Sequence, residues 1–333
     1  MAEKRSTYRA LVVRERGKGS FVGQVETLNF AQLADDEVLI KVCYSSLNYK
    51  DALSAAGNRG VTRRYPHVPG IDAVGVVEKS AGGAWRPGER VIVSGFDLGM
   101  NHDGGFAEYL TAPEEWLLSL PAGMNFEESM SWGTAGFTAA QCVAKLLENG
   151  ATPQRGRIVV TGASGGVGSF SVALLAKLGF EVVAVSGKDE GHFLVDLGAV
   201  EVLTREAFLE ASGKPLLQEK WAGAVDTVGG GYLETAIRQC SYGSTVTCCG
   251  NAASADLHLS VYPFILRGVT LAGIDSARCP VSRRTALWQK MAGEWALDQL
   301  ADLVTVITLD ELGENFGKIL AGMIRGRVVV KMV

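Results

Sequence analysis

A glycine-rich segment constrains the fold of this 333-residue chain more than any other feature. It reads Ile158-Val159-Val160-Thr161-Gly162-Ala163-Ser164-Gly165-Gly166-Val167-Gly168-Ser169, between a predicted strand and a predicted helix. Gly165 lets the backbone approach a pyrophosphate, Gly168 lets helix and strand pack closely, and the helix N-terminus offers free N–H groups. Although Ala163 replaces the first glycine of the strict pattern, we interpret the segment as a dinucleotide-binding loop rather than a tight turn that binds nothing.

The sequence around this loop alternates between apolar runs typical of strands and stretches typical of helices. The predicted elements are a helix over Ser131–Leu147, strand Arg157–Val160, helix Val167–Leu178, strand Phe180–Val185, a helix ending at Leu197, strands Val200–Leu203 and Ala224–Val228, helix Tyr232–Cys240, and strands Ser244–Cys249 and Val269–Ile274. Alternation at this length indicates an α/β fold, with a doubly wound parallel sheet of the Rossmann type.

The first part of the chain has a different texture, with short apolar runs separated by turn residues. The predicted strands are Tyr8–Val13, Glu37–Val42, Asp72–Val77, Glu89–Val93 and Phe106–Leu110. A helix is expected around Asn48–Ala56, and near the end a helix over Glu311–Ile324 and a strand over Arg327–Met332. We therefore predict a β-rich substrate domain over residues 1–128, joined by residues 300–333, and a cofactor domain over residues 129–299.

The end of the second predicted strand distinguishes between dinucleotides. NAD sites place Asp or Glu there, about 20 residues after the glycine loop, to bind the ribose 2′-OH. Here the strand ends in Ala184-Val185-Ser186-Gly187-Lys188, and Arg205 follows the third strand. A hydroxyl, a glycine and cations suit a 2′-phosphate, so we predict NADPH. Asp189 and Glu190 are assigned to the next helix, and the missing acid also disfavours an S-adenosylmethionine methyltransferase.

Composition excludes several classes of function. The net charge of −4 gives no basic footprint, so nucleic acid is not an expected partner. No apolar run reaches the ~18 residues of a membrane span, and the N-terminus lacks the apolar core of a signal peptide, so we expect a cytoplasmic protein with no membrane partner.

The six cysteines form no CxxC pair, which predicts no metal site. We interpret Cys248 and Cys249 as buried thiols rather than a redox pair, because neighbours on a strand point to opposite faces.

Several motifs, in order along nearly the whole chain, resemble one known family. They are Ser45-Ser46-Leu47-Asn48-Tyr49-Lys50-Asp51, Pro69-Gly70-Ile71-Asp72-Ala73-Val74-Gly75, Pro87-Gly88-Glu89-Arg90-Val91, Gly133-Thr134-Ala135-Gly136-Phe137-Thr138, the glycine loop, Asp226-Thr227-Val228-Gly229, Pro263-Phe264-Ile265-Leu266-Arg267 and Gly326-Arg327-Val328-Val329-Val330-Lys331. These resemble the quinone-oxidoreductase-like subgroup of the medium-chain dehydrogenase/reductase superfamily, which includes acrylyl-CoA reductase. The resemblance implies a GroES-like substrate domain beside the Rossmann domain, and a homodimer.

The resemblance also implies that catalysis needs no zinc. In zinc-dependent alcohol dehydrogenases of the superfamily, the first Cys ligand corresponds to Asn48 and the His ligand to Ile71, and their four closely spaced structural cysteines have no counterpart here. Neither residue supplies what a tetrahedral zinc site needs. Hydrogen-bond donors must then stabilise the charge that develops on the substrate. By resemblance, NADPH reduces the C=C of an α,β-unsaturated carbonyl, with acrylyl-CoA giving propionyl-CoA as the leading reaction.

Four residues are predicted to act in catalysis. Asn48 is expected to donate its amide to a carbonyl or to orient the nicotinamide, and Tyr49 to contact the cofactor or act as a general acid. The alternative for Tyr49 is a half-buried aromatic residue that hydrogen-bonds through its hydroxyl. Asp51 is either catalytic or paired with Lys50 at the start of a helix. Arg327 either reaches the active site or forms a surface salt bridge.

The remaining predicted cofactor contacts lie in the glycine loop and at the carboxyl ends of strands, where Rossmann folds bind ligands. The full set of predicted cofactor-binding residues is Tyr49, Thr138, Ser164, Gly165, Gly166, Val167, Ser186, Gly187, Lys188, Arg205, Cys249, Gly250, Ile274 and Ser276.

Alternatives to this function stay open. In one, the substrate is a quinone or a broad set of enones instead of an enoyl thioester. In another, the chain binds NADPH without turnover, as a sensor. A cluster of Arg59, Arg63 and Arg64 is either a site for CoA phosphates or an exposed, solvated loop.

Overall fold

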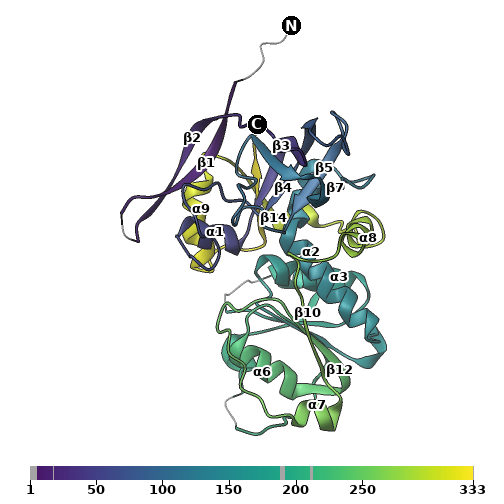
Figure 1. Cartoon of the computed structure of the whole chain (residues 1–333). Coiled ribbons are helices and arrows are strands. Elements are labelled where there is room, and N and C mark those ends of the chain that lie inside the picture. Colours follow the sequence, from purple (N-terminus) through teal and green to yellow (C-terminus); the bar gives the residue numbers. More distant parts are fainter. Residues whose placement is uncertain (1–5, 18, 188–191, 211–212, 333) are drawn as a thin grey trace. The chain divides into compact units, whose positions relative to one another are not determined.

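The chain folds into two compact units in the computed structural model, which describes residues 6–17, 19–187, 192–210 and 213–332 (Figure 1). The first unit comprises Met1–Thr134, Ala277–Gly293 and Leu300–Val333, and the second comprises Ala135–Ser276 and Glu294–Gln299. Helix α2 (Phe126–Glu148) passes from one unit to the other and is kinked at Gly133, whose φ of 47° is not helical.

The second unit is built on a six-stranded parallel sheet with the order β10-β9-β8-β11-β12-β13. The strands are β8 (Ile158–Thr161), β9 (Val182–Val185), β10 (Ala199–Leu203), β11 (Trp221–Asp226), β12 (Cys240–Cys248) and β13 (Thr270–Gly273). Numbered within the unit the order is 3-2-1-4-5-6, which is the Rossmann arrangement. The predicted doubly wound sheet is therefore confirmed.

Helices connect these strands, and each packs apolar residues on the sheet. They are α3 (Gly166–Lys177), α4 (Phe193–Asp196), α5 (Arg205–Phe208), α6 (Gly230–Gln239) and α7 (Tyr262–Arg267). Residues 188–191, where we predict the start of the helix ending at Leu197, lie outside the described part of the chain. Helix α7 is absent from our predictions because Pro263 and the short apolar run masked its period.

The first unit is mainly antiparallel. Its seven-stranded sheet has the order β14-β15-β3-β4-β5-β7, with β6 also paired to β3, and a separate ribbon is formed by β1 and β2. The strands are β1 (Thr7–Glu15), β2 (Phe21–Asn29), β3 (Glu37–Leu47), β4 (Asp72–Ser80), β5 (Arg90–Ser94), β6 (Tyr109–Pro113), β7 (Leu117–Ser119), β14 (Val304–Thr308) and β15 (Arg327–Lys331). Its helices are α1 (Tyr49–Ala55), α8 (Val281–Ala292) and α9 (Leu312–Leu320).

Our predictions missed β2, β14 and α8, whose sequences mix polar and apolar residues without a clear period. The predicted strand Phe106–Leu110 was also shifted, since β6 begins at Tyr109. Residues before it pair elsewhere, because the amide of Phe106 donates to the carbonyl of Pro69. Local pattern does not register such pairing with a distant segment.

The unit boundaries differ from the predicted domain boundaries. The second unit starts at Ala135 rather than 129, and residues 277–293 belong to the first unit. The reason is Arg284, a buried residue of α8 whose guanidinium donates to the carbonyl of Ser94 at 2.8 Å and to that of Ala277 at 3.0 Å. These bonds tie α8 to the end of β5.

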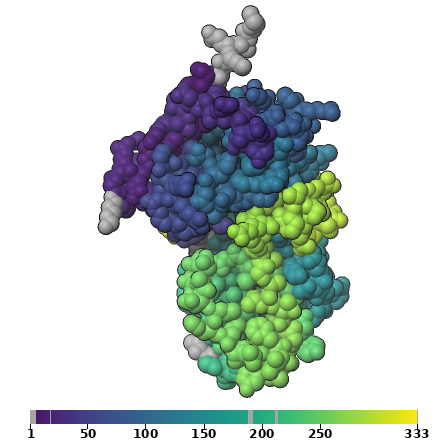
Figure 2. All heavy atoms as spheres, in the orientation of Figure 1, coloured from purple at the N-terminus to yellow at the C-terminus, as the bar shows by residue number. Residues whose placement is uncertain are grey.

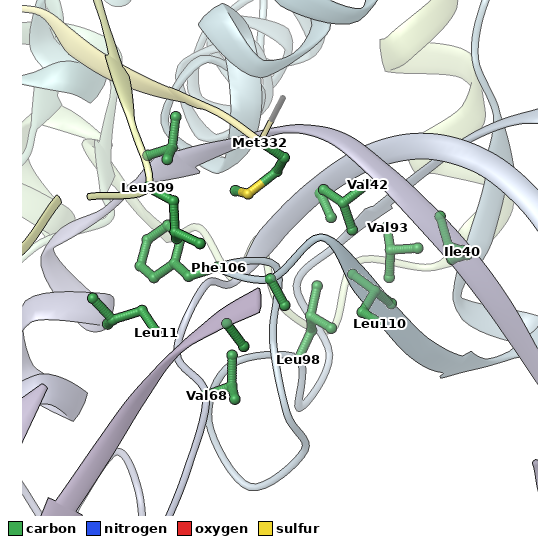
Figure 3. Close-up of a cluster of buried hydrophobic side chains, with 14 of the residues drawn as sticks. Leu11, Ile40, Val42, Val68, Val93, Leu98, Phe106, Leu110, Leu309 and Met332 are labelled. Atoms are coloured by element: carbon green, nitrogen blue, oxygen red, sulfur yellow. The ribbon is translucent and has the colours of Figure 1, made fainter. Parts of the chain in front are cut away.

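The core of the first unit gathers side chains from both ends of the chain. Figure 3 shows Leu11 and Phe106 beside Leu309, with Met332 close to Val42. Strand β15 holds the C-terminal segment there by pairing antiparallel with β3, with Val329 opposite Ser46. No helix among the described residues is long and apolar enough to cross a membrane.

Candidate active site

The glycine loop of the second unit joins β8 to α3 in the geometry that a dinucleotide needs. A Cβ on Gly168 would lie 2.2 Å from the carbonyl oxygen of Gly162, so only glycine lets the helix pack this closely. Gly162 itself has a φ of 61°, and a Cβ there would lie 2.3 Å from Thr227 Oγ1. Gly165 is the N-cap residue of α3, and no described side chain caps the helix. The first amides of the helix are thereby left for an anionic ligand.

The end of β9 brings together three of the predicted residues for the 2′-phosphate. Ser186 is buried, and its hydroxyl donates to Ser164 Oγ at 3.3 Å. The Arg205 side chain lies over Gly187, where a Cβ would be 1.9 Å from Arg205 Nε. The described residues that directly follow β9 are Ser186 and Gly187, so no carboxylate of the described residues stands at this strand end. Lys188 lies outside the described residues.

The other predicted cofactor residues lie at the ends of neighbouring strands or in α2. Cys249 and Gly250 follow β12, and Gly250 is packed so tightly that a Cβ would lie 2.1 Å from the carbonyl oxygen of Thr227. Ile274 and Ser276 follow β13, and Thr138 is buried in α2. The Cys142 thiol and burial both raise the pKa of Cys249, so this thiol is protonated at neutral pH.

A buried aspartate of the second unit, which our predictions did not select, organises the turn after β11. Thr161 Oγ1 donates to Asp226 Oδ1 at 2.6 Å, and the amides of Gly229 and Val228 donate to Oδ2 at 2.8 and 3.3 Å. Burial raises the pKa of Asp226. The carboxylate thus links the strand before the glycine loop to the Asp226-Thr227-Val228-Gly229 turn.

In the first unit, Asn48 lies at the start of α1 with its amide fully used. Its Nδ2 donates to Asp72 Oδ2 at 2.8 Å and to the carbonyl of Ser46 at 3.1 Å, while Oδ1 accepts from Arg327 Nη1 at 3.0 Å. Both N–H groups that we predicted for a carbonyl or the nicotinamide are therefore donated within the protein. The geometry gives Asn48 a place in a polar cluster rather than a free donor.

Asp72 is the centre of this cluster and was absent from our predicted site. Its Oδ2 accepts from Ser46 Oγ at 2.6 Å and from the amide of Thr134 at 2.8 Å, in addition to Asn48, and its Oδ1 accepts from Thr134 Oγ1 at 2.7 Å. The amide of Thr134 is exposed to this carboxylate by the kink at Gly133, where a Cβ would lie 2.5 Å from Ser46 Oγ. The kink is thus required by the cluster.

Arg327 supplies the positive charge of the cluster. It is buried, so the surface salt bridge that we considered is wrong. Its Nη2 lies 3.9 Å from Asp72 Oδ2 and donates to Ser46 Oγ at 2.7 Å, and its Nη1 also donates to the carbonyl of Leu47 at 3.1 Å. Burial lowers the pKa of Arg327, and the two carboxylates of Asp72 and Asp51 oppose that shift. Asp72, Asn48, Ser46, Thr134 and Arg327 are called the Asp72 cluster below.

Asp51 lies in the first turn of α1 and holds the loop that follows. Its Oδ2 accepts from the amide of Asn48 at 2.8 Å, and its Oδ1 accepts from those of Ile71 and Gly70 at 2.9 and 3.1 Å. The pairing with Lys50 that we considered is wrong, because these amides are the partners of Asp51 and Lys50 is exposed. Burial raises the pKa of Asp51 to about 7, although the backbone donors act in the opposite direction.

Tyr49 differs from its neighbours because it faces solvent. Its side chain is 44% exposed, and its hydroxyl bonds to no described residue. The half-buried, hydrogen-bonded aromatic that we considered is therefore wrong. Within this stretch, Asn48 and Asp51 are fixed by internal bonds and Tyr49 presents a phenol that is able to donate.

The positions that correspond to zinc ligands hold Asn48 and Ile71. Ile71 has no ligand atom, and the Asn48 amide is used within the Asp72 cluster. Across the described ranges, no group of three or more His, Cys, Asp or Glu residues is placed to hold a metal ion.

Two family comparisons match complementary parts of the chain. The alcohol dehydrogenase GroES-like domain matches residues 34–122, within the first unit. The zinc-binding dehydrogenase family matches residues 166–293 and covers most of the second unit.

Curated relatives extend over nearly the full length. The putative quinone oxidoreductase YhfP of Bacillus subtilis is 42% identical over 92% of this chain and 94% of the relative. The acrylyl-CoA reductase AcuI of Ruegeria pomeroyi is 41% identical over 97% of this chain and 98% of the relative. The probable acrylyl-CoA reductase AcuI of Escherichia coli is 42% identical over 96% and 98%.

Solved structures match equally well. The yhdH oxidoreductase of Salmonella enterica in complex with NADP is 42% identical, has a TM-score of 0.93, and is matched over 98% of this chain and 100% of its own. Escherichia coli YhdH with bound NADPH is 42% identical over 97% and 99%, with a TM-score of 0.92. Bacillus subtilis yhfP with NAD bound is 40% identical over 98% and 100%, with a TM-score of 0.95.

Proposed function

This chain belongs to the medium-chain dehydrogenase/reductase family, in its zinc-free, quinone-oxidoreductase-like subgroup, and on that basis we propose that it is an NADPH-dependent reductase of α,β-unsaturated thioesters. The leading reaction is acrylyl-CoA, NADPH and a proton giving propionyl-CoA and NADP⁺. The observation that carries the proposal is identity of 41–42% to acrylyl-CoA reductases over nearly the whole of both chains.

The residues of the second unit fit NADPH. The uncapped start of α3 after Gly165 offers amides to the pyrophosphate. Arg205, which follows the third strand and whose side chain lies over Gly187, offers a cation and N–H donors to the 2′-phosphate, where a carboxylate would repel it. These are the residues that we assign to hold the cofactor, which supplies a hydride to Cβ of the substrate.

The first unit contributes the polar groups that act on the substrate. When Cβ accepts hydride, negative charge develops on the thioester oxygen and Cα then takes a proton. We assign the Tyr49 hydroxyl as the hydrogen-bond donor to that oxygen. It forms no hydrogen bond with a described residue that would have to break first. Asn48, Asp51 and Arg327 act as positioning residues in this proposal, because their polar atoms are occupied by internal bonds that fix α1.

The test is NADPH oxidation by the purified protein with acrylyl-CoA, with 1,4-benzoquinone as a second substrate and NADH as a second cofactor. We expect rapid turnover of acrylyl-CoA that is selective for NADPH. Turnover of benzoquinone alone would replace the substrate by a quinone, which the similarity to YhfP supports as the second candidate. No turnover with either substrate would favour a protein that binds NADPH without catalysis.

The role of Tyr49 is tested by Tyr49→Phe. Loss of one preorganised donor at a developing oxyanion lowers kcat about 10²-fold. We therefore expect kcat with acrylyl-CoA to fall by about that factor, while the Kd for NADPH, measured by fluorescence titration, changes little. Tyr242→Phe is the matched control, because Tyr242 is also an exposed tyrosine, at 73% exposure, and it lies on β12 of the second unit. Equal kcat values for both variants would remove Tyr49 from catalysis.

We also propose a homodimer formed through the edge of the Rossmann sheet. Strand β13 ends the sheet, and the adjacent α7 and its N-cap residue expose a group of large apolar side chains. They are Val261, Tyr262, Ile265 and Leu266. A second copy of the chain would cover this face, as exposed apolar groups of this kind mark interfaces. Ile265→Glu with Leu266→Glu is expected to yield monomers in light scattering, whereas a monomeric unmutated protein would exclude the dimer.

A further inference from the structure

The loop between α1 and β4 is held rigidly against the far end of α1. Tyr65 donates through its hydroxyl to the carbonyl of Ser54 at 2.6 Å, and the hydroxyls of Ser54 and Thr62 lie 2.6 Å apart. Ser54 is near the C-terminal end of α1, whose seven residues span about 10 Å. The loop therefore lies at a fixed separation from Asn48 and Tyr49, which occupy the opposite end of the same helix.

The Arg59 guanidinium group is occupied by contacts within the first unit. Its guanidinium lies over the rings of Phe21 and Tyr65, 5.4 and 5.1 Å from their centroids, and its Nη2 donates to Glu15 at 2.6 Å. Its Nη1 donates to the carbonyl of Arg63 at 2.9 Å. The ribbon of β1 and β2, which contributes Phe21 and Glu15, lies on the surface beside the segment that contains this loop (Figure 2). Arg59 thus stabilises the loop. Its positive charge is compensated by the Glu15 carboxylate, so we do not assign it to a ligand.

Arg63 and Arg64 differ from Arg59 in that no carboxylate compensates their charge in the described residues. Both side chains are exposed, and neither forms an ion pair with any carboxylate in the described residues. The backbone of Arg63 is fixed nonetheless, because its carbonyl accepts from Arg59 and its amide donates to Asn101 Oδ1 at 3.3 Å. Two adjacent guanidinium groups without a carboxylate partner, one of them on a backbone held by hydrogen bonds, suit a phosphate, which arginine binds in a bidentate manner.

We infer that Arg63 and Arg64 bind the phosphates of the CoA part of an acyl-CoA substrate, while the acyl thioester lies at the Tyr49 end of α1. The inference rests on the proposed function and sharpens it, because it separates an enoyl-CoA reductase from a reductase of free enones or quinones. In a CoA thioester the pyrophosphate and 3′-phosphate are separated from the reacting carbon by the long pantetheine arm. The order of groups along the substrate then matches the order of residues along α1 and its loop.

The experiment compares two thioesters, of which only one carries the phosphate-bearing part of CoA. Steady-state rates of NADPH oxidation are measured with acrylyl-CoA and with the acrylyl thioester of N-acetylcysteamine, which has the same reacting carbons and no phosphate. The variants are Arg63→Gln with Arg64→Gln, and the control Lys79→Gln with Arg86→Gln, which removes the same two positive charges from exposed positions elsewhere in the first unit. Inhibition by CoA and by dephospho-CoA identifies which phosphate is bound.

We expect the double glutamine variant to raise KM for acrylyl-CoA by about tenfold or more, since charge-assisted hydrogen bonds are lost. Its kcat/KM for the N-acetylcysteamine thioester is expected to stay within about twofold of the unmutated protein. The KM of the unmutated protein for acrylyl-CoA should also rise with ionic strength, and that dependence should weaken in the variant.

Three results would overturn the inference. Equal losses with both thioesters would show a general defect of the loop, and an unchanged KM for acrylyl-CoA would show that the arginines bind no phosphate. The same rise in KM in the Lys79 and Arg86 control would assign it to overall charge. If the unmutated protein reduces neither thioester, the proposed function itself fails and this inference falls with it; the other results leave that function standing.

Discussion

Asp72 in the first unit and Asp226 in the second are both aspartates with no exposed surface, yet the two units stabilise them differently. Asp72 accepts from the side chains of Ser46, Asn48 and Thr134, and a buried arginine lies 3.9 Å away. Asp226 accepts from Thr161 and from two amides of its own turn, with no cation in contact among the described residues.

The difference separates two uses of a buried carboxylate. Asp226 shapes a local turn, since two of its three partners lie two and three residues further along the chain. Asp72 instead joins segments that are far apart in sequence, because Ser46 is 26 residues away, Thr134 is 62 residues away and the arginine comes from the last strand. A carboxylate of the second kind controls the tertiary structure around α1, on which the proposed catalytic tyrosine is carried.

The comparison predicts its largest effect for Asp72→Asn. The substitution removes the carboxylate that lies nearest the buried Arg327, and breaking such a buried pair costs about 3–5 kcal/mol in the free energy of unfolding. Asp226→Asn loses only charge-assisted hydrogen bonds and should cost about 1–3 kcal/mol. Urea unfolding of both variants measures the two values. Equal destabilisation would mean that the two aspartates have equivalent roles, contrary to the contrast drawn above.

A smaller effect is expected from the kink in α2. Gly133→Ala places a methyl group 2.5–2.8 Å from Ser46, Arg327 and Asp72 at a positive φ. Overpacking and backbone strain together should cost about 2–4 kcal/mol. Gly123→Ala is the control, because Gly123 also has a positive φ but no atom within 4 Å of the added carbon, and about 1 kcal/mol is expected there. Similar melting temperatures for the two variants would contradict the tight packing of the Asp72 cluster.

The last comparison concerns pH and Asp51, which bonds to backbone amides as Asp226 does, and its effect per pH unit is the smallest of the three. Burial raises the pKa of Asp51 to about 7, so the folded protein holds a proton that the unfolded chain releases near pH 4. The contribution of Asp51 to stability is then fully present below about pH 4 and decreases by up to about 1.4 kcal/mol per pH unit as the pH rises to about 7. Urea unfolding at several pH values should show this slope in the unmutated protein relative to Asp51→Asn. A constant difference between the two proteins would exclude it.

The second unit was largely predictable because its signals are local. Gly165, Gly168 and Ser186 occur at fixed spacings from a strand, and one strand–loop–helix unit determines their geometry. The parallel, doubly wound sheet followed from the alternation of strands and helices. Asp226 was missed as a functional residue, although an acid at the end of an apolar strand signals a buried carboxylate that needs donors.

The Asp72 cluster was much less predictable. Asn48 and Arg327 were selected, but their bond to each other spans 279 residues and no periodicity reports it. Asp72 carried one usable signal, since it stands between Ile71 and Ala73 in an apolar run and a buried carboxylate requires compensation. The kink at Gly133 was also beyond prediction, because a glycine within a helical pattern has no special meaning until its neighbours in space are known.

The antiparallel pairing of β15 with β3 has a consequence for the synthesis of the chain. Asp72 leaves the ribosome 255 residues before Arg327, which at about 5–20 residues per second is an interval of roughly 13–50 s. During that time the second unit is already translated almost completely, while the first lacks β14, β15 and the cation of the Asp72 cluster. The nascent chain therefore holds the whole cofactor unit before the arginine arrives, and a ribosome-stalled fragment ending before Gly326 should retain NADPH binding but leave Tyr44–Leu47 of β3 without the partner strand β15.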